Sequence, residues 1–474
     1  MDNIVKLAAQ LSAEPEAISE DMVALEFAAR YTNELRFDHD RGKWFHWNGN
    51  IWECERTKLA FSWARSLTRE MSKGRKSKAR ASVCRVNFAS GVEKMAQADR
   101  AFAVTSDAWD RDHYLLGTPR GTVDLRTGEL REARPEDLIS KQTAVAPAAT
   151  ADCPLWLKFL REATQDNQGL IDFLQCFCGY CLTGDTKEHA FLFCWGPGGN
   201  GKGVTQNTVG AIMGDYRANA AVATFVATRG ERHPTDLAML HGARLVTSSE
   251  TEEGHAWAES RIKTITGGDM VTARFMRQDF FQFKPQFKFQ FKPQFKLLII
   301  GNHKPTLQNV DEAARRRINM VSFLYAPATP DRDLEKKLEA EWPGILRWLI
   351  EGCLRWQREG LVKPSVVTEA TNEYFEDQDS VQQWIDECCD TTDRRAESKN
   401  SDLFKSWSMW ADVRGERAST SRWPVHTLDR MGFRKFRTKQ VRGFRGIRVA
   451  AAPGVDTGDV ELGAPPSFAD YRSK

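Results

Sequence analysis

Apolar residues recur at two different spacings in the middle of the chain. Between residues 155 and 188 they follow a helical spacing, whereas short continuous apolar runs occur at 190–195, 243–250 and 296–302. Short apolar runs bounded by polar or turn-forming residues are typical of buried strands. Because helical patterns separate the three runs, the sequence predicts an α/β domain with a mostly parallel sheet.

The flanking segments show other patterns. Residues 22–60 begin as a helix and end in a Trp-rich stretch, where Asn48-Gly49 predicts a two-residue hairpin. Residues 61–100 are helical in spacing and basic, and the segment LLGTPRGTVDLRTGELREARP alternates as short strands do. At about 150 residues per domain, 474 residues predict roughly three domains. We place them at 1–150 (α+β), 151–375 (α/β) and 376–450, followed by a tail at 451–474 that we expect to be disordered.

An octapeptide, FQFKPQFK, occurs at 281–288 and again without change at 289–296. Two copies are too few for a solenoid. Loops tolerate insertions well, because the entropy of loop closure grows slowly with length. We therefore expect an exposed hairpin or loop here, whose lysines either protect edge strands or contact a nucleic-acid strand.

Charge and composition exclude several classes of protein. The 67 basic and 64 acidic residues give a net charge of +3, so any binding to nucleic acid must be local. A hydrophobic fraction of 41% excludes a wholly disordered or collagen-like chain. No apolar run approaches about 18 residues and the N-terminus lacks an export signal, so we expect a soluble cytoplasmic protein with no membrane partner.

Two local clusters leave alternatives open. Cys176, Cys178 and Cys181 lie in an apolar helical run, which favours a buried helix over a zinc site. The second cluster is basic and is either a solvated helix face or a DNA contact. It comprises Arg65, Arg69, Lys73, Arg75, Lys76, Lys78, Arg80 and Arg85.

The sequence GPGGNGK follows a predicted strand and precedes a helical pattern, which is the context of a phosphate-binding loop. Glycines let backbone N–H groups face a phosphate, and Lys202 can reach the β- and γ-phosphates. The candidate nucleotide-binding residues are Gly196, Pro197, Gly198, Gly199, Asn200, Gly201, Lys202, Gly203 and Val204. Gly203 replaces the usual Ser or Thr that ligates magnesium, Thr205 is a weak substitute, and a site that binds without hydrolysis stays an alternative.

Polar residues follow the second and third predicted strands. Glu250 is the first candidate to meet magnesium or orient the attacking water, with Glu252 in reserve. Asn302, an uncharged polar residue, ends the third strand and is either a candidate site residue or a turn residue. Arg316 and Arg317 precede the strand-like INMVSF and could supply charge to a phosphate bound by a neighbouring subunit, although an arginine triplet is often merely solvated.

Together these segments resemble a superfamily 3 helicase, and more narrowly the ATPase portion of phage and plasmid primase-helicases related to the poxvirus primase-helicase. GPGGNGK resembles motif A, RLVTSSETEEG motif B and LLIIGNHKP motif C, with Asn302 as sensor. KTITGGDMVTARF is similar to the segment between motifs B and C, and RRINMVSF to the arginine-finger segment. The resemblance covers roughly residues 25–450.

The resemblance implies an AAA+ type P-loop ATPase that uses ATP and Mg²⁺ and forms a ring, commonly a hexamer, around DNA. It implies that a hairpin before motif C enters the channel, with Lys263, Arg274 and Arg277 as candidate DNA contacts. It also implies a winged-helix domain at 376–450. There, basic residues alternate with phenylalanines in a pattern that indicates a phosphate contact or a solvated hairpin; they include Arg434, Lys435, Arg437, Lys439 and Arg442.

The resemblance does not extend to a primase domain. Asp38-His39-Asp40 is the nearest approach to a pair of metal-binding carboxylates, and 150 residues are few for such a domain. We therefore expect the helicase portion alone, acting on single-stranded and duplex DNA, with a primase or an initiator as a separate partner. The alternatives are an origin-melting initiator and an ATP-gated DNA-binding module with little hydrolysis.

Overall fold

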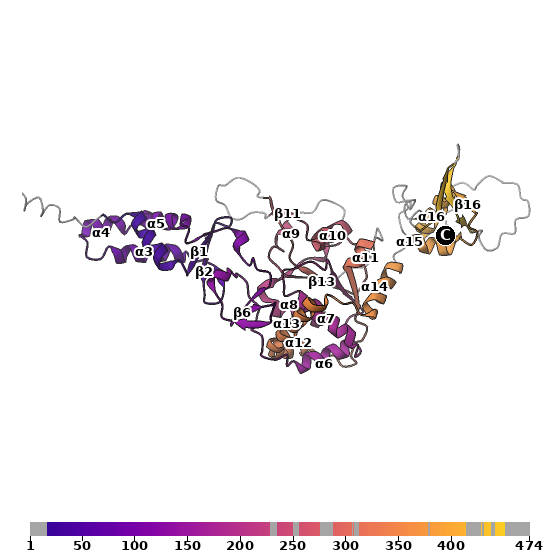
Figure 1. The fold of residues 1–474 in the computed structure, drawn as a ribbon, viewed down its shortest axis with the longest axis horizontal. Coiled ribbons are helices and arrows are strands. Elements are labelled where there is room, and N and C mark those ends of the chain that lie inside the picture. The colour runs from indigo at the N-terminus through magenta and orange to yellow at the C-terminus, as the bar shows by residue number, and fades with distance from the viewer. Residues whose placement is uncertain are drawn as a thin grey trace, which may run out of the picture. The chain divides into compact units, whose positions relative to one another are not determined.

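The chain divides into two compact units, Met1–Tyr374 and Phe375–Lys474, each described here by itself (Figure 1). The computed structural model describes residues 17–227, 235–249, 256–274, 288–305, 307, 312–377, 380–413, 428, 431–437 and 441–450. The predicted boundary after residue 375 lies next to the division between the units, and the one near residue 150 lies inside the first unit. The tail at 451–474 lies outside the described residues.

The first unit begins with a helical bundle joined to a small sheet. Its helices are α2 (Glu20–Tyr31), α3 (Leu59–Met71), α4 (Ser77–Val83) and α5 (Val86–Ala98). Its sheet, in the order β3-β2-β1-β4, contains β1 (Leu35–Asp38), β2 (Lys43–Trp47), β3 (Trp52–Cys54) and β4 (Ala103–Val104). Helical spacing places Ala60, Ala64 and Leu67 in one core with Phe27 and Phe102.

The predicted Trp-rich hairpin is confirmed, but its turn is longer than predicted. Strands β2 and β3 pair antiparallel with Trp47 opposite Trp52, so four residues connect them. The side-chain oxygen of Asn48 accepts hydrogen bonds from the backbone N–H groups of Asn50 and Ile51, both at 2.9 Å. This Asx turn replaces the two-residue turn, and Gly49 adopts a φ of +98° within it.

The predicted short strands after residue 114 form a second antiparallel sheet, β5-β6-β7. Its strands are β5 (Leu115–Thr118), β6 (Gly121–Asp124) and β7 (Glu129–Arg131). Buried Arg244 donates hydrogen bonds to the carbonyl oxygens of Leu115 (2.8 Å) and Leu182 (2.7 Å). The hydroxyl of Tyr216 accepts from the backbone N–H of Gly117 at 2.9 Å. These contacts join the small sheet to the α/β part of the unit.

A five-stranded parallel sheet forms the centre of the unit, in the order β14-β8-β13-β10-β9. Its strands are β8 (Phe191–Trp195), β9 (Arg217–Asn219), β10 (Leu245–Ser249), β13 (Lys296–Gly301) and β14 (Ile318–Ser322). The three predicted strands are confirmed, as is the strand-like INMVSF. The sequence analysis missed β9, a three-residue edge strand without an apolar run.

Helices cover both faces of this sheet (Figure 1). They are α6 (Pro154–Ala163), α7 (Gln168–Tyr180), α8 (Lys202–Met213), α9 (Thr235–Ala238), α10 (Glu259–Gly267), α11 (Glu312–Arg317), α12 (Leu334–Leu338), α13 (Trp342–Glu359) and α14 (Ser365–Asp377). Leu192 and Cys194 of β8 join a core formed with α7, α8 and α13. Their neighbours Phe191 and Phe193 contact Trp257 on the other face, as the two-residue period of a strand requires.

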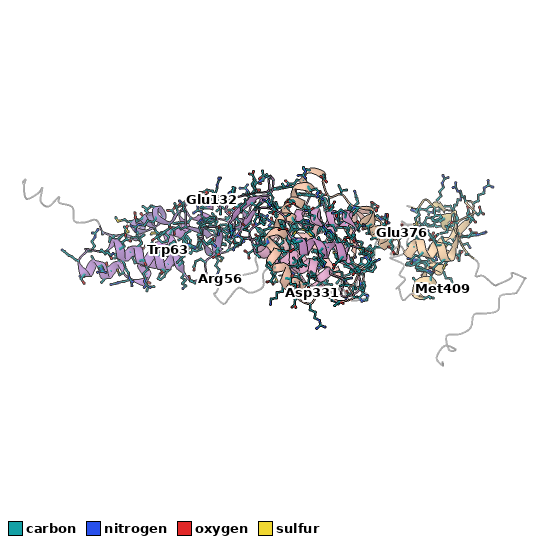
Figure 2. All side chains as sticks on the ribbon, turned by 90° about the horizontal axis from the view of Figure 1, so that it is seen from below. Arg56, Trp63, Glu132, Asp331, Glu376 and Met409 are labelled. Atoms are coloured by element: carbon teal, nitrogen blue, oxygen red, sulfur yellow. The ribbon has the colours of Figure 1, made fainter. Side chains whose placement is uncertain are left out.

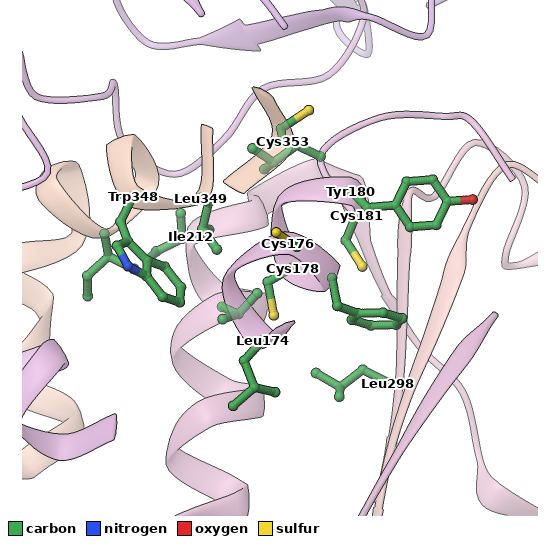
Figure 3. Close-up of a cluster of buried hydrophobic side chains, with 14 of the residues drawn as sticks. Leu174, Cys176, Cys178, Tyr180, Cys181, Ile212, Leu298, Trp348, Leu349 and Cys353 are labelled. Carbon is green, nitrogen blue, oxygen red and sulfur yellow. The ribbon is translucent and has the colours of Figure 1, made fainter. Parts of the chain in front are cut away.

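The cysteine cluster lies in that core (Figure 3). Cys176, Cys178 and Cys181 are 7%, 3% and 1% exposed, on α7 and at its C-cap. Burial raises the pKa of the Cys181 thiol to about 12. The predicted buried helix is therefore confirmed.

Among the described helices, none is long and apolar enough to cross a membrane.

The repeated octapeptide contributes to two strands. Strand β11 (Val271–Arg274) pairs antiparallel with β12 (Lys288–Phe291), which crosses the junction of the two copies. The second copy ends at Lys296, the first residue of β13, where Phe295 and Lys296 are 3% and 2% exposed. The expectation of an exposed loop is therefore wrong for the end of the second copy, because it continues directly into the central strand.

The second unit is small and has its own core. Its elements are α15 (Ser380–Cys388), β15 (Cys389–Asp390), β16 (Glu397–Lys399), α16 (Asn400–Val413), β17 (Arg434–Arg437), β18 (Arg442–Arg445) and β19 (Arg448–Val449). Strands β16, β18 and β17 form an antiparallel sheet, and β15 pairs with β19. Trp384, Trp407, Trp410 and Phe444 are buried in its core.

Candidate functional site

The loop between β8 and α8 adopts a conformation that depends on its glycines. Gly196, Gly199 and Gly201 have φ values of +151°, +77° and +88°, in the region that side chains disfavour. A Cβ atom at Gly196 would lie 2.0 Å from the carbonyl oxygen of Phe323. Glycine therefore lets this loop lie close to the end of β14.

Lys202, the first residue of α8, points back into this loop. Its Nζ donates hydrogen bonds to the carbonyl oxygens of Gly196 (2.6 Å) and Pro197 (2.9 Å) and to Oδ1 of Asn200 (3.0 Å). The side chain is 6% exposed, and desolvation lowers its pKa. Asn200 in turn donates from Nδ2 to the carbonyl oxygen of Phe323. The loop thus holds a buried ammonium group among neutral oxygens.

The residues in the first turns of α8 have different surroundings. A Cβ atom at Gly203 would have nothing within 4 Å. The hydroxyl of Thr205 donates to the carbonyl oxygen of Gly201 at 3.1 Å, and Val204 packs against the core. Buried Gln206 donates from Nε2 to the carbonyl oxygens of Ser248 (3.0 Å) and Leu298 (2.9 Å). The sequence analysis missed Gln206, which has no distinctive motif around it.

The register of the sheet sets the neighbours of this loop. Trp195 pairs with Gly301 in parallel strands. Gly196 and Asn302, which follow these two residues, therefore both lie at the carboxyl ends of their strands. Ser249 pairs with Ile300 and ends β10. Asn302 is exposed. Glu250 and Glu252 follow Ser249 in the chain but lie outside the described residues.

Two side chains near the carboxyl ends of β8 and β10 have a buried polar atom without a hydrogen-bond partner among the described residues. These are Oγ of Ser248 and Nε1 of Trp195. Lys304 lies over the Trp195 ring, with Nζ 4.1 Å from its centroid. Sequence patterns do not distinguish such atoms from ordinary strand residues, because only packing leaves them unpaired.

Arg316 and Arg317 lie at the amino ends of the parallel strands, opposite to the carboxyl ends where the β8–α8 loop begins. They end α11, and Ile318, which follows them, pairs with Phe191 at the start of β8. Parallel strands keep their amino ends together, so the chain does not bring these arginines to its own β8–α8 loop. Arg316 is exposed, and Arg317 lines a small pocket with Lys263 of α10.

The candidate DNA contacts are placed in part. Arg274 ends β11 opposite Lys288, so the predicted hairpin before β13 exists as a strand pair. In the second unit, the predicted basic residues on β17 and β18 are exposed; they are Arg434, Lys435, Arg437 and Arg442. Arg277 and Lys439 lie outside the described residues.

The register of β17 and β18 brings like charges together. Arg434 is opposite Arg445, and Arg437 is opposite Arg442. Arg445 also donates to Glu397 at 2.8 Å. Directly opposed like charges destabilise a strand pair. The hairpin therefore carries uncompensated positive charge at Arg437 and Arg442, which have no ion-pair partner among the described residues.

The carboxylate of Asp38 has a structural role. It is fully buried, and its Oδ2 accepts hydrogen bonds from Trp109 Nε1 and Ser106 Oγ, both at 2.9 Å. Its Oδ1 accepts from the backbone N–H groups of Asp40 (3.0 Å) and Arg41 (3.1 Å). These bonds use the carboxylate to hold the turn after β1.

Parts of the chain are similar to a D5-type family and to viral proteins that are named as helicases. Residues 24–165 match the family described as "D5 N terminal like", and residues 194–317 match a family of unknown function, DUF5906. The chain is 25% identical over 327 residues to "Putative helicase L207/L206" of Acanthamoeba polyphaga mimivirus. It is 26% identical over 228 residues to "Putative helicase 022R" of Frog virus 3.

These matches are partial in length. The mimivirus alignment covers 64% of this chain and 33% of its relative, and the Frog virus 3 alignment covers 44% and 23%. The apo structure of the C-terminal region of NrS-1 resembles the chain with a TM-score of 0.50 at 11% identity, covering 88% of this chain and 96% of that structure. That similarity concerns the fold.

Proposed function

We propose that this chain is an ATP-dependent DNA helicase of phage or plasmid replication, which moves along single-stranded DNA as a ring, commonly a hexamer. One observation carries the proposal: a buried lysine in a glycine loop, between a central parallel strand and the helix after it. The relatives named as helicases support the same direction.

The loop fits a nucleotide phosphate. Its glycines adopt conformations that bring backbone close to a ligand, and α8 begins directly after them. The Lys202 ammonium is bonded to three neutral oxygens. Phosphate oxygens would replace some of these with charge-assisted bonds, which are stronger. Lys202 would hold the β- and γ-phosphates, with Gly196 to Val204 around them.

The other roles follow from the strand ends. Glu250 would orient the attacking water, and Asn302 would contact the γ-phosphate beside Gly196. Arg316 or Arg317 would come from a neighbouring subunit, since within one chain they lie at the amino ends of the strands and the β8–α8 loop lies at the carboxyl ends.

Magnesium fits the described residues of this site less well than a nucleotide phosphate does. Within the described part of the chain, no group of three or more His, Cys, Asp or Glu residues could hold a metal ion. Gly203 offers no hydroxyl, and that of Thr205 is bonded to Gly201. Glu250 and Glu252 are the carboxylates that would hold Mg²⁺, which would neutralise phosphate charge when bound.

DNA would meet two basic elements. Lys263, Arg274 and Arg277 would line the channel of a ring. In the second unit, Arg437 and Arg442 lie opposite each other on paired strands. A DNA phosphate bound between them would neutralise the repulsion of their two positive charges. Arg434, Lys435 and Lys439 extend this basic hairpin. A separately encoded primase or initiator is a further proposed partner.

The test is steady-state ATP hydrolysis with magnesium, with and without single-stranded DNA. We compare the chain with Lys202→Ala and Glu250→Gln, and use Lys158→Gln, an exposed residue of α6, as the control. DNA-stimulated turnover that both site variants abolish supports a motor. Duplex unwinding then separates a helicase from an origin-melting initiator.

ATP binding with turnover no higher than in the variants would contradict the helicase proposal. It would favour the second candidate, an ATP-gated DNA-binding module. The observation behind that candidate is Gly203, which leaves the position after the lysine without a metal ligand.

A further inference from the structure

The tip of the N-terminal helices carries a concentrated positive charge. Residues 65–85 contain eight basic residues and one acidic residue, a charge of +7 in a chain whose total is +3. The rest of the chain therefore carries −4. This stretch spans the end of α3, all of α4 and the start of α5, which adjoin in the bundle (Figure 1).

The one acidic residue does not neutralise this charge. Glu70 accepts hydrogen bonds from Nη1 of Arg30 on α2, at 3.0 Å to both oxygens. Seven basic side chains of the tip are exposed and make no ion pair or hydrogen bond with any residue that the structure describes. They are Arg65, Arg69, Lys73, Lys76, Lys78, Arg80 and Arg85.

Packing does not explain this arrangement. The buried residues of α3 are Ala60, Ala64, Leu67 and Thr68, and α4 buries only Val83. Helix α5 begins after Arg85 with no side-chain capping bond and no acidic residue in its first turn. A cation at this end of a helix opposes the helix dipole. Mutual repulsion of seven cations is thus a cost that the described fold does not offset.

We propose that this basic tip binds the phosphate backbone of duplex DNA. Sites for single strands combine cations with exposed aromatic faces. Residues 65–85 contain no Phe, Trp or Tyr. The nearest aromatic residue before them is Trp63, which is labelled in Figure 2. Its ring packs on that of Tyr31, with centroids 4.6 Å apart. Cations on helices without stacking platforms suit phosphates held in a fixed array, as on a duplex.

This surface is separate from the β8–α8 loop, so its binding should not require ATP. The experiment measures fluorescence anisotropy of a labelled duplex, and of a single strand of equal length, without nucleotide and at several salt concentrations. The test variant is Lys76→Gln/Lys78→Gln/Arg80→Gln. The control is Lys158→Gln/Arg161→Gln/Arg358→Gln, which removes three exposed cations from α6 and α13.

We expect the test variant to bind duplex more weakly and with a shallower salt dependence. Each lost phosphate contact lowers the slope of log K against log salt by about 0.9. The control variant should match the wild type, and the test variant should retain ATP hydrolysis stimulated by single strands. If Lys202→Ala abolishes hydrolysis but leaves duplex binding intact, the tip acts as a separate DNA site.

An unchanged affinity and slope for duplex would overturn the proposal, provided that circular dichroism shows the variant folded. A larger loss on the single strand than on the duplex would overturn the choice of duplex. Loss of binding to vesicles of anionic phospholipid, with duplex binding intact, would assign the tip to a lipid surface instead.

Discussion

The glycines of the β8–α8 loop are under unequal constraint at the scale of single residues. Gly196 faces the Phe323 carbonyl so closely that any side chain would force the backbone to move. Gly203 has open space around it and lies in α8 without a positive φ. Steric fit therefore explains the glycine at 196, and the structure gives no steric reason for the one at 203.

Replacing Gly203 tests how the site holds magnesium. We expect Gly203→Thr to lower the magnesium concentration needed for half-maximal ATP hydrolysis, because a hydroxyl after the lysine is the usual ligand. Gly203→Ala is the control, since it also replaces glycine, which costs about 1 kcal/mol relative to Ala within a helix, but adds no hydroxyl. Magnesium titrations that coincide for Thr and Ala would show that the hydroxyl plays no part.

Lys296 is a buried charge at the start of β13. Its Nζ donates to the carbonyl oxygens of Thr183 and Asp185 and lies 4.5 Å from the centroid of the Tyr180 ring. Its pKa is lowered to about 7, chiefly by burial; the positive charge of Arg244 adds to the shift, while Cys181 and Asp185 oppose it. The folded unit therefore binds this proton less tightly than the unfolded chain.

This shift predicts a rise of stability with pH. Between the folded pKa of about 7 and an unfolded value of about 10.4, the unfolded chain binds more protons, so the free energy of unfolding increases with pH. The contribution approaches about 1.4 kcal/mol per pH unit. Lys296→Met should lack it, and denaturant unfolding under reducing conditions at increasing pH measures the difference. Parallel pH profiles for the two proteins would contradict the lowered pKa.

At the scale of elements, the repeated octapeptide is continuous with the central sheet. Its second copy enters β13 through Phe295 and Lys296, whereas Lys288 holds the equivalent place in the first copy and lies in β12. Because the copies are identical, removing either one yields the same protein sequence. Leu297 then follows Phe-Lys as before.

Deleting residues 289–296 should leave ATP binding intact. The remaining copy supplies the Phe-Lys pair that precedes β13, and loops tolerate changes of length at little entropic cost. Nucleotide binding by titration and thermal unfolding measure the outcome, with the undeleted chain as reference. Loss of nucleotide binding would show that the β8–α8 loop needs the full length of both copies.

Several elements were predictable from short-range pattern. Strands β8 and β13 are buried on both faces and so read as nearly continuous apolar runs, whereas β10 is buried from Leu245 to Ser248 although it contains Thr and Ser. Strand β9 lies at an edge with the polar sequence RAN, and its pairing with β10 depends on tertiary contact. The turn at Asn48 was predicted in place but not in length, because the Asx bonds depend on where β2 and β3 end.

At the scale of the whole molecule, the β8–α8 loop and Arg316 lie at opposite ends of two adjacent parallel strands, the loop after β8 and Arg316 before β14. If Arg316 acts on ATP at this loop, as proposed, it must come from another copy of the chain. A ring with heterologous contacts supplies such an arrangement at each interface.

Mixing two inactive variants tests this arrangement. Lys202→Ala chains keep the arginine and Arg316→Ala chains keep the loop, so mixed rings contain intact sites between unlike neighbours. We expect each variant to be inactive alone and an equal mixture to recover roughly a quarter of wild-type hydrolysis. Mixtures with Lys202→Ala/Arg316→Ala are the control. No recovery in assembled mixed rings would exclude Arg316 as a residue acting across the interface.

The sequence by itself determined the alternation of helices with the central strands other than β9, the glycine loop with Lys202 and the basic stretches, because these depend on side-chain period and on residues adjacent in the chain. Only the tertiary structure decided that Asn302 lies beside Gly196, that Arg316 lies far from both, and that Glu70 is occupied by Arg30. The physical reason is register and packing: which strand ends meet, and which charges find partners, depends on contacts between residues distant in the chain.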